Sequence, residues 1–331
     1  MKLSRKLIIT LVVLSGLFSL IYLNRLLLLQ YSLGWYTDIA HPRSSPRDIP
    51  WANGPNTAAT SPSKRPPNII FILVDDLGIN DVTLYGGGRG AEGVSTPNID
   101  AIGKAGVRFD QAYAGSAVCT VSRAALLTGR YPWRFGVEFT PTPGALSRVV
   151  GSLYNNPNRL LPVIVDHEKA KVTKDFEQLG MPASEKTIAE LLKDRGYHNI
   201  HIGKWHLGST AEMRPNNQGF DETLFMECGL YLPEKDPRVV NSKQDFDPID
   251  RFLWPNMRFG VATTVANGLS PNAISPTTLL TKQSTLLARI KIDPSLCILR
   301  IGVFTPHFKL VKKITTLFRK SKTIVAAYMA P

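Results

Sequence analysis

The chain has 331 residues, of which 44% are hydrophobic and 20% are charged, and its formal net charge is +13. This length and this hydrophobic content allow a large buried core in one or two domains, and they exclude an intrinsically disordered chain. The three cysteines, Cys119, Cys228 and Cys297, are too few for a disulfide framework and therefore say little about the redox compartment.

The positive charge is concentrated near the C-terminus. Residues 281–331 contain ten Lys and Arg but only one acid, Asp293, so this segment carries +9 of the total. No aromatic-interleaved or helix-turn-helix pattern accompanies the charge, and we therefore expect no nucleic-acid partner. A basic tail can also bind anionic lipid, which leaves a basic membrane-surface protein as one alternative.

Residues 1–30 begin with a basic flank and continue as an apolar segment. Lys2, Arg5 and Lys6 precede an apolar run from Leu7 to Leu23, close to the ~20 residues that a membrane-spanning helix needs. No convincing small-x-small cleavage site follows, so we expect an uncleaved signal anchor with its basic end in the cytoplasm. The rest of the chain would face the periplasm, the secretory lumen or the exterior. A signal peptide is the alternative, and its cleavage would give a secreted protein.

Residues 31–66 are rich in Pro, Ser, Asn and Thr and indicate a linker. The apolar run 68–74 then predicts a strand buried on both faces. Further strands are predicted at HNIHIG, which ends at Lys204, and at residues 296–304.

Several further elements are predicted around these strands. Thr96 as cap, Pro97 in the first turn and Gly106 at the exit predict a helix. Residues 107–114 are predicted as a strand, residues 122–127 as a helix, and residues 184–195 as a helix with Ser184 as cap. The alternation of strands and helices favours an α/β fold with a largely parallel sheet and helices on both faces.

Three of the predicted strands end in polar residues, namely Asp75 with Asp76, Lys204 with His206, and His307. Ligands of α/β proteins bind outside the carboxyl ends of such strands, so these groups can converge on one pocket. Adjacent carboxylates suit calcium or, less well, magnesium, and both can reach one ion where the strand breaks into a loop. Lys204 beside His206 suits an anionic oxyacid group. Ordinary solvated loops remain the alternative for each group alone.

The stretch CTVSRAALLTGR, residues 119–130, places a cysteine at the start of a helix. A helix N-terminus acidifies a thiol and favours anions, and Arg123 lies one turn further on. From the residues alone, an inert free cysteine remains an alternative for Cys119.

Together these motifs resemble the sulfatase family, within the alkaline phosphatase superfamily. The family signature, Cys-x-Pro/Ala-Ser-Arg followed by Thr-Gly-Arg, is similar to CTVSRAALLTGR. The metal-binding strand of the family is similar to NIIFILVDDLG, and its Gly-Lys-Trp-His motif is similar to GYHNIHIGKWHLG. STPNIDAIGKAGVRFDQAYA and FTPHFKL resemble two further segments in the same order. The resemblance extends over roughly residues 67–310 and implies sulfuric ester hydrolysis of a small-molecule or carbohydrate sulfate, as in an arylsulfatase.

The resemblance also implies a role for each candidate residue. Cys119 would be oxidised by a formylglycine-generating enzyme, and the hydrate would attack sulfur. Asp75 and Asp76 would bind calcium together with residue 119. Arg123 would support the hydrate, Lys204 would bind a sulfate oxygen, and His206 would transfer protons. His307 would act as an acid at the leaving group.

The sequence departs from the family in two places. Val121 stands where the modifying enzyme prefers Pro or Ala, which is expected to reduce conversion of Cys119. We also expect residues 67–331 to be an incomplete N-terminal catalytic domain, without the later half of the calcium site and without the C-terminal subdomain. Segment 262–300 fits the family poorly, and the final IVAAYMAP corresponds to the start of a family helix.

Two alternatives therefore remain within this resemblance. One is a phosphonate or phosphodiester hydrolase of the same superfamily, which uses the same nucleophile and a divalent metal. The other is an inactive truncated pseudoenzyme or fragment, because two carboxylates alone bind calcium weakly.

Overall fold

The structure is a computed structural model. It describes residues 4–25, 66–87, 95–154 and 163–228, the strands 260–265, 268–271, 296–301 and 323–329, and a few single positions. The chain divides into two compact units, residues 1–43 with 231–259, and residues 44–230 with 260–331. The first unit contains helix α1, and the second contains the sheet and the remaining elements.

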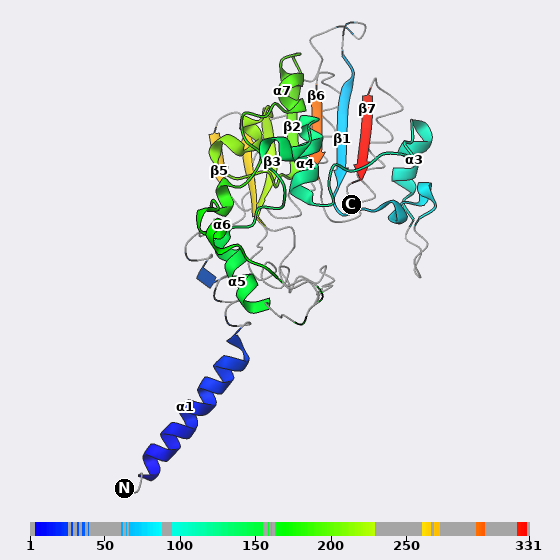
Figure 1. Cartoon of the computed structure of the whole chain (residues 1–331). Coiled ribbons are helices and arrows are strands. Elements are labelled where there is room, and N and C mark those ends of the chain that lie inside the picture. The colour runs from blue at the N-terminus through cyan, green and yellow to red at the C-terminus, as the bar shows by residue number, and fades with distance from the viewer. Residues whose placement is uncertain are drawn as a thin grey trace. The chain divides into compact units, whose positions relative to one another are not determined.

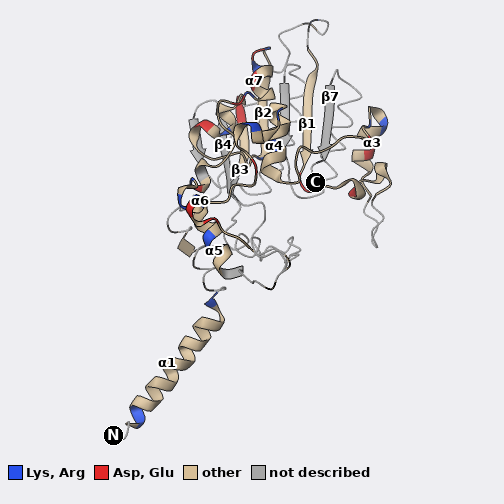
Figure 2. Cartoon of the chain, in the orientation of Figure 1, with Lys and Arg blue, Asp and Glu red and all other residues tan. Residues whose placement is uncertain are grey.

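Helix α1, Arg5–Leu23, confirms that the N-terminal apolar run is helical. It begins where the Ser4 side chain accepts a hydrogen bond from the backbone N–H of Leu7. The helix has 19 residues, none of them buried, and an 18-residue window of it has a mean hydropathy of 2.2, so it is long and apolar enough to cross a membrane. Figure 2 shows Lys and Arg only towards the ends of this segment. These features suit a signal anchor and a signal peptide equally.

The second unit is built on one seven-stranded sheet (Figure 1). Strands β7, β1, β6, β2 and β3 are parallel, whereas β4 is antiparallel to β3 and β5 to β4. The prediction of an α/β fold with a largely parallel sheet is therefore confirmed. The strands in chain order are β1 Asn68–Val74, β2 His198–Lys204, β3 Glu222–Cys228, β4 Gly260–Val265, β5 Gly268–Pro271, β6 Leu296–Ile301 and β7 Thr323–Met329.

Strand β6 lies between β1 and β2. Its last residue, Ile301, is in register with Leu73 of β1 and with Gly203 of β2. Because all three strands run in the same direction, the segments that follow β1 and β2 leave the sheet at one edge. Asp75 and Lys204 therefore emerge within one residue of the same level on the two sides of β6.

The helices of the second unit support this edge. Helix α4 begins at Cys119 and ends before Gly129, which adopts a left-handed φ of 66° and donates its N–H to Ala125. The buried face of α4 and the ends of β1, β2 and β3 contribute to one apolar core that includes Val121, Leu127 and Trp205. The helices are α3 Pro97–Ala105, α4 Cys119–Thr128, α5 Gly144–Tyr154, α6 His167–Val172 and α7 Ile188–Lys193, with short 3-10 helices η1 Ile79–Asp81, η2 Thr83–Tyr85, η3 Pro132–Phe135, η4 Phe176–Gln178, η5 Ala211–Met213 and η6 Pro215–Asn217.

The strand predicted at residues 107–114 is wrong. This segment contains no regular structure, and Val107, Phe109 and Tyr113 are 77%, 71% and 80% exposed. A strand needs a partner for its backbone groups, and none of the described strands pairs with this segment.

Three helix predictions also need correction. The helix predicted from Ser184 begins four residues later, because Thr187 accepts from the N–H of Glu190 and forms a capping box with it. The helix predicted at residues 122–127 begins three residues earlier, at Cys119. The C-terminal IVAAYM, expected at the start of a helix, instead forms β7, whose residues pair with β1 from Asn68 to Val74.

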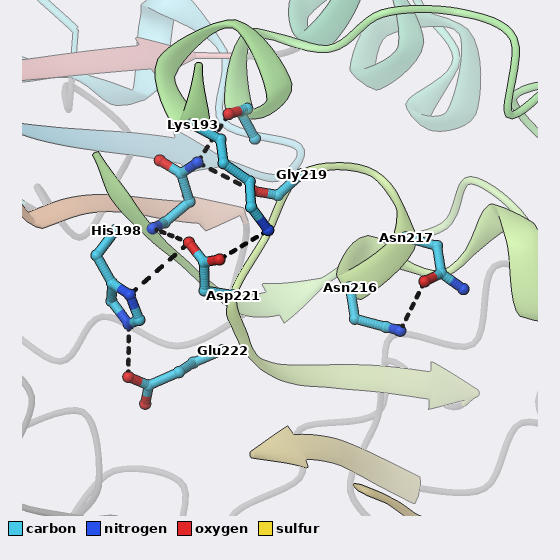
Figure 3. Close-up of polar contacts among 9 residues, drawn as sticks. Lys193, His198, Asn216, Asn217, Gly219, Asp221 and Glu222 are labelled. Atoms are coloured by element: carbon cyan, nitrogen blue, oxygen red, sulfur yellow. Dashed lines mark hydrogen bonds and ion pairs between the residues drawn. The ribbon is translucent and has the colours of Figure 1, made fainter. Parts of the chain in front are cut away.

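A polar cluster ties α7 to the amino-terminal ends of β2 and β3 (Figure 3). Lys193 forms an ion pair with Asp221 at 2.8 Å, and the other Asp221 oxygen accepts from the N–H of Asn199. The Nε2 of His198 lies 2.7 Å from the Glu222 carboxylate. These contacts fix the strand starts, at the edge opposite the one where Asp75 and Lys204 emerge.

Candidate active site

The end of β1 breaks sharply, as a shared metal site at Asp75 and Asp76 requires. The strand stops at Val74, and Asp76 has a left-handed φ of 52°. A non-glycine residue rarely adopts this conformation, and such residues cluster at functional sites. The break lets both carboxylates face the start of α4.

Cys119 lies opposite these carboxylates. It is the first residue of α4, and its Sγ lies 4.0 Å from Oδ1 of Asp76. One ligand atom each from Asp75, Asp76 and Cys119 falls within 4.8 Å of the others. That span is comparable to twice a calcium–oxygen bond of roughly 2.4 Å, so the three groups can surround one cation.

Arg123 is buried and joins three elements. From α4, one guanidinium nitrogen donates to Oδ1 of Asp75 at 2.6 Å, and another donates to the backbone carbonyl of Lys204 at 2.8 Å. Its side chain is 2% exposed. A charge this deeply buried is tolerated only when it is paired, so the position of Arg123 is firmly specified.

Lys204 ends β2 and is also buried. Its ammonium group donates to Oδ2 of Asp75 at 2.7 Å, so both oxygens of Asp75 contact a cation. Burial opposes ionisation of Asp75, but the charges and hydrogen bonds of Arg123 and Lys204 outweigh burial and hold its pKa below the ordinary value. Burial, followed by the charge of Asp75, raises the pKa of Asp76.

His206 follows β2 and is the second strained residue at this edge, with a left-handed φ of 62°. Burial, then the charges of Lys204 and Arg123, lower its pKa from the ordinary 6.5, so the imidazole is neutral near pH 7. A neutral imidazole can accept or donate a proton.

A small hollow of about 30 Å³ borders His206. It is mostly apolar and is large enough for one water molecule or a small group. It is lined by Pro141, Phe176, Leu179, Trp205, His206, Gly208, Ser209 and Phe225.

Of the seven residues predicted from strand ends and the signature, the structure brings together Asp75, Asp76, Cys119, Arg123 and Lys204, and it places His206 at the same edge. The prediction for His307 lies outside the described residues. Sequence reasoning missed the double ion pairing of Asp75, because no local pattern shows that β1 and β2 flank a common strand. It also missed the hollow, whose lining comes from segments far apart in the chain.

The carboxyl edge of this parallel sheet carries two carboxylates, a cysteine at the start of a helix, and two buried positively charged side chains. These features define an α/β protein that is suited to holding a metal cation and an oxyanion together. The family model described as Sulfatase matches residues 67–253, which is more than half of the chain. The chain belongs to the sulfatase family.

Individual relatives agree with this assignment. The chain is 38% identical over 174 residues to a human protein named Arylsulfatase H, covering 50% of this chain and 25% of that one. It is 36% identical over 191 residues to a rat N-acetylgalactosamine-6-sulfatase, covering 57% of this chain and 31% of that one. The chain therefore spans between a quarter and a third of the length of these relatives. The structure of the sulfatase PsFucS1 from Pseudoalteromonas sp. shares the fold, with a TM-score of 0.51, 20% identity, and coverage of 81% of this chain and 56% of that one.

Proposed function

We propose that this site hydrolyses sulfuric esters, with residue 119 as the nucleophile. The observation that carries the proposal is the position of Cys119 at the start of α4, beside the Asp75–Asp76 turn and one helical turn before Arg123. This arrangement supports the proposal, because a nucleophile at residue 119 would lie in one cluster with carboxylates for a cation and with positive charge for an oxyanion. Substrates would be small-molecule or carbohydrate sulfate esters.

Cys119 would be the precursor of formylglycine, produced by a separate modifying enzyme. The aldehyde hydrate would supply one hydroxyl to attack sulfur and a second to expel sulfate afterwards. In the unmodified chain, the Sγ of Cys119 stands in for the attacking oxygen. The open backbone N–H groups at the start of α4 favour the negative charge that develops there.

The donor set fits a hard divalent cation, since Asp75 and Asp76 offer carboxylate oxygens beside residue 119. Calcium, or less well magnesium, would polarise the sulfate and the nucleophile when bound. Calcium takes six to eight oxygen ligands, so further ligands must come from water, substrate or residues outside these three.

The remaining side chains would hold the substrate and move protons. Lys204 would bind a sulfate oxygen, and Arg123 would keep residue 119 and Asp75 in place. Neutral His206 would accept a hydrogen bond from the hydrate and exchange its proton. His307 would protonate the leaving alcohol.

We further propose that α1 anchors the protein in a membrane, with the sheet domain in the periplasm, the secretory lumen or the exterior. Its length and hydropathy support the anchor, and the basic residues at its start support this orientation.

The test is calcium-dependent hydrolysis of an aryl sulfate by the purified chain, after co-expression with a formylglycine-generating enzyme. Cys119→Ala should abolish the turnover. Faster hydrolysis of the matching aryl phosphate would favour the phosphodiester alternative. An absence of turnover, with residue 119 shown by mass spectrometry to be converted, would favour the pseudoenzyme.

A further inference from the structure

The charged groups at the proposed site already balance one another. Asp75 and Asp76 carry two negative charges, and Arg123 and Lys204 carry two positive ones. Both Asp75 oxygens are engaged, and the side chains of Asp75, Arg123 and Lys204 are all 5% exposed or less. A divalent cation added here would therefore leave the cluster with an uncompensated charge of +2, close to two positive side chains.

The two positive side chains are not held equally. Arg123 is fixed by two partners on different strand ends, Asp75 and the carbonyl of Lys204. Within the described part of the chain, the Lys204 ammonium has one hydrogen-bond partner, Oδ2 of Asp75. Its long unbranched stem also allows other rotamers. Lys204 is therefore the cation that can move.

We propose that Lys204 exchanges between two partners: it pairs with Asp75 when the metal site is empty, and it moves to the sulfate group when a divalent cation binds at Asp75 and Asp76. This inference rests on the proposed function, because it concerns the same cation and anion. Lys204 would then do more than bind sulfate, because its ammonium group would neutralise Asp75 while the metal site is empty.

The exchange makes metal and anion binding cooperative. A cation that displaces Lys204 from Asp75 leaves a buried ammonium without a partner, and such a group is costly unless an anion reaches it. A sulfate group that binds Lys204 in turn frees Oδ2 of Asp75 for the cation. By thermodynamic linkage, each ligand must raise the affinity of the other by the same factor.

The test is calorimetric titration of the full chain with calcium chloride, in sodium sulfate or in sodium chloride of equal ionic strength. We expect sulfate to tighten calcium binding by about tenfold, within the usual range of coupling between sites. Lys204→Met should bind calcium more tightly than the unchanged chain in chloride and should show no effect of sulfate. Lys193→Met is the matched control, because it removes a lysine paired with Asp221 outside the site, and it should keep the coupling.

A second measurement needs no variant. Acetylation of Lys204 by an amine-directed reagent, followed by mass spectrometry, should be slow without calcium, faster with calcium, and slow again when sulfate is added. Coupling that persists in Lys204→Met, or acetylation that calcium does not change, would overturn the exchange while leaving sulfatase activity untouched. Failure of the chain to bind calcium at all would overturn both the exchange and the metal assignment.

Discussion

Arg123 donates a 2.8 Å hydrogen bond to the backbone carbonyl oxygen of Lys204, although the two residues are 81 positions apart in the chain. The same guanidinium group also holds Asp75. One buried side chain thus fixes the start of α4 against the ends of two strands that are not neighbours in the sheet.

Arg123 should therefore matter for stability as well as for chemistry. Arg123→Met leaves Asp75 with one cation and removes the guanidinium donor of the Lys204 carbonyl, so we expect a loss of about 3 kcal/mol in the free energy of unfolding. Urea denaturation followed by circular dichroism measures this loss. Arg130→Met, which removes the ion pair of the more exposed Arg130 with Glu185, is the control and should cost about 1 kcal/mol or less. Equal losses in the two variants would contradict the central role of Arg123.

Thr187 caps α7 and should be sensitive to substitution. Thr187→Ala removes the hydrogen bond from the N–H of Glu190 and the one to the Gln218 carbonyl, so we expect a loss of about 1–2 kcal/mol. Ser184→Ala is the matched control, because Ser184 precedes the helix without capping it. The stability of that variant should change by less than about 0.5 kcal/mol.

His201 should make the fold sensitive to mild acid. Its ring is fully buried, edge-on to Trp205 and Phe220. Burial, with a smaller effect from the Arg123 charge, lowers its pKa from 6.5 to about 3. Between these pH values the unfolded chain binds a proton that the folded chain does not bind. The contribution of His201 to stability is therefore complete above pH 6.5 and falls as the pH decreases towards 3.

The measurement is urea denaturation at a series of pH values from 4 to 7, comparing the unchanged chain with His201→Leu. The unchanged chain should lose up to about 1.4 kcal/mol more per pH unit in this window than the variant. Parallel curves for the two proteins would show that His201 does not cause the loss.

Val121 should limit the maturation of Cys119 if the family preference for Pro or Ala holds here. Val121→Ala is expected to increase the fraction of chains converted to formylglycine during co-expression with the modifying enzyme, as measured by mass spectrometry of the peptide that contains residue 119. Val121 is buried in the core, so the same change should reduce stability by about 1–2 kcal/mol. An unchanged converted fraction would show that Val121 is accepted.

Much of the site could be predicted because its residues stand beside strong local signals. The apolar runs of β1 and β2 end where the sequence indicated, and Asp75, Asp76 and Lys204 follow directly. The parallel sheet then brings strand ends to one edge. Local signals also explain the errors. The segment VRFDQAYA has the composition of a strand, but no described strand pairs with it. The segment IVAAYM suits a helix or a strand by composition, and its pairing with β1 makes it a strand.

The ionic contacts were beyond sequence reasoning for a different reason. Lys204 with His206 suggested an anion site, but its pairing with Asp75 depends on the strand order β2-β6-β1, which only the folded sheet reveals. The contact from Arg123 to the Lys204 carbonyl likewise involves a backbone group that no residue pattern marks.

The position of β6 between β1 and β2 also determines when the site can form. Strand β1 ends at Val74, yet the strand that joins it to β2 begins only at Leu296. During synthesis, Asp75, Arg123 and Lys204 all leave the ribosome well before β6, and loop closure over such separations is slow. Cys119 should therefore remain in an open, unpaired segment for much of translation, which gives a modifying enzyme access to the thiol before the sheet closes around it.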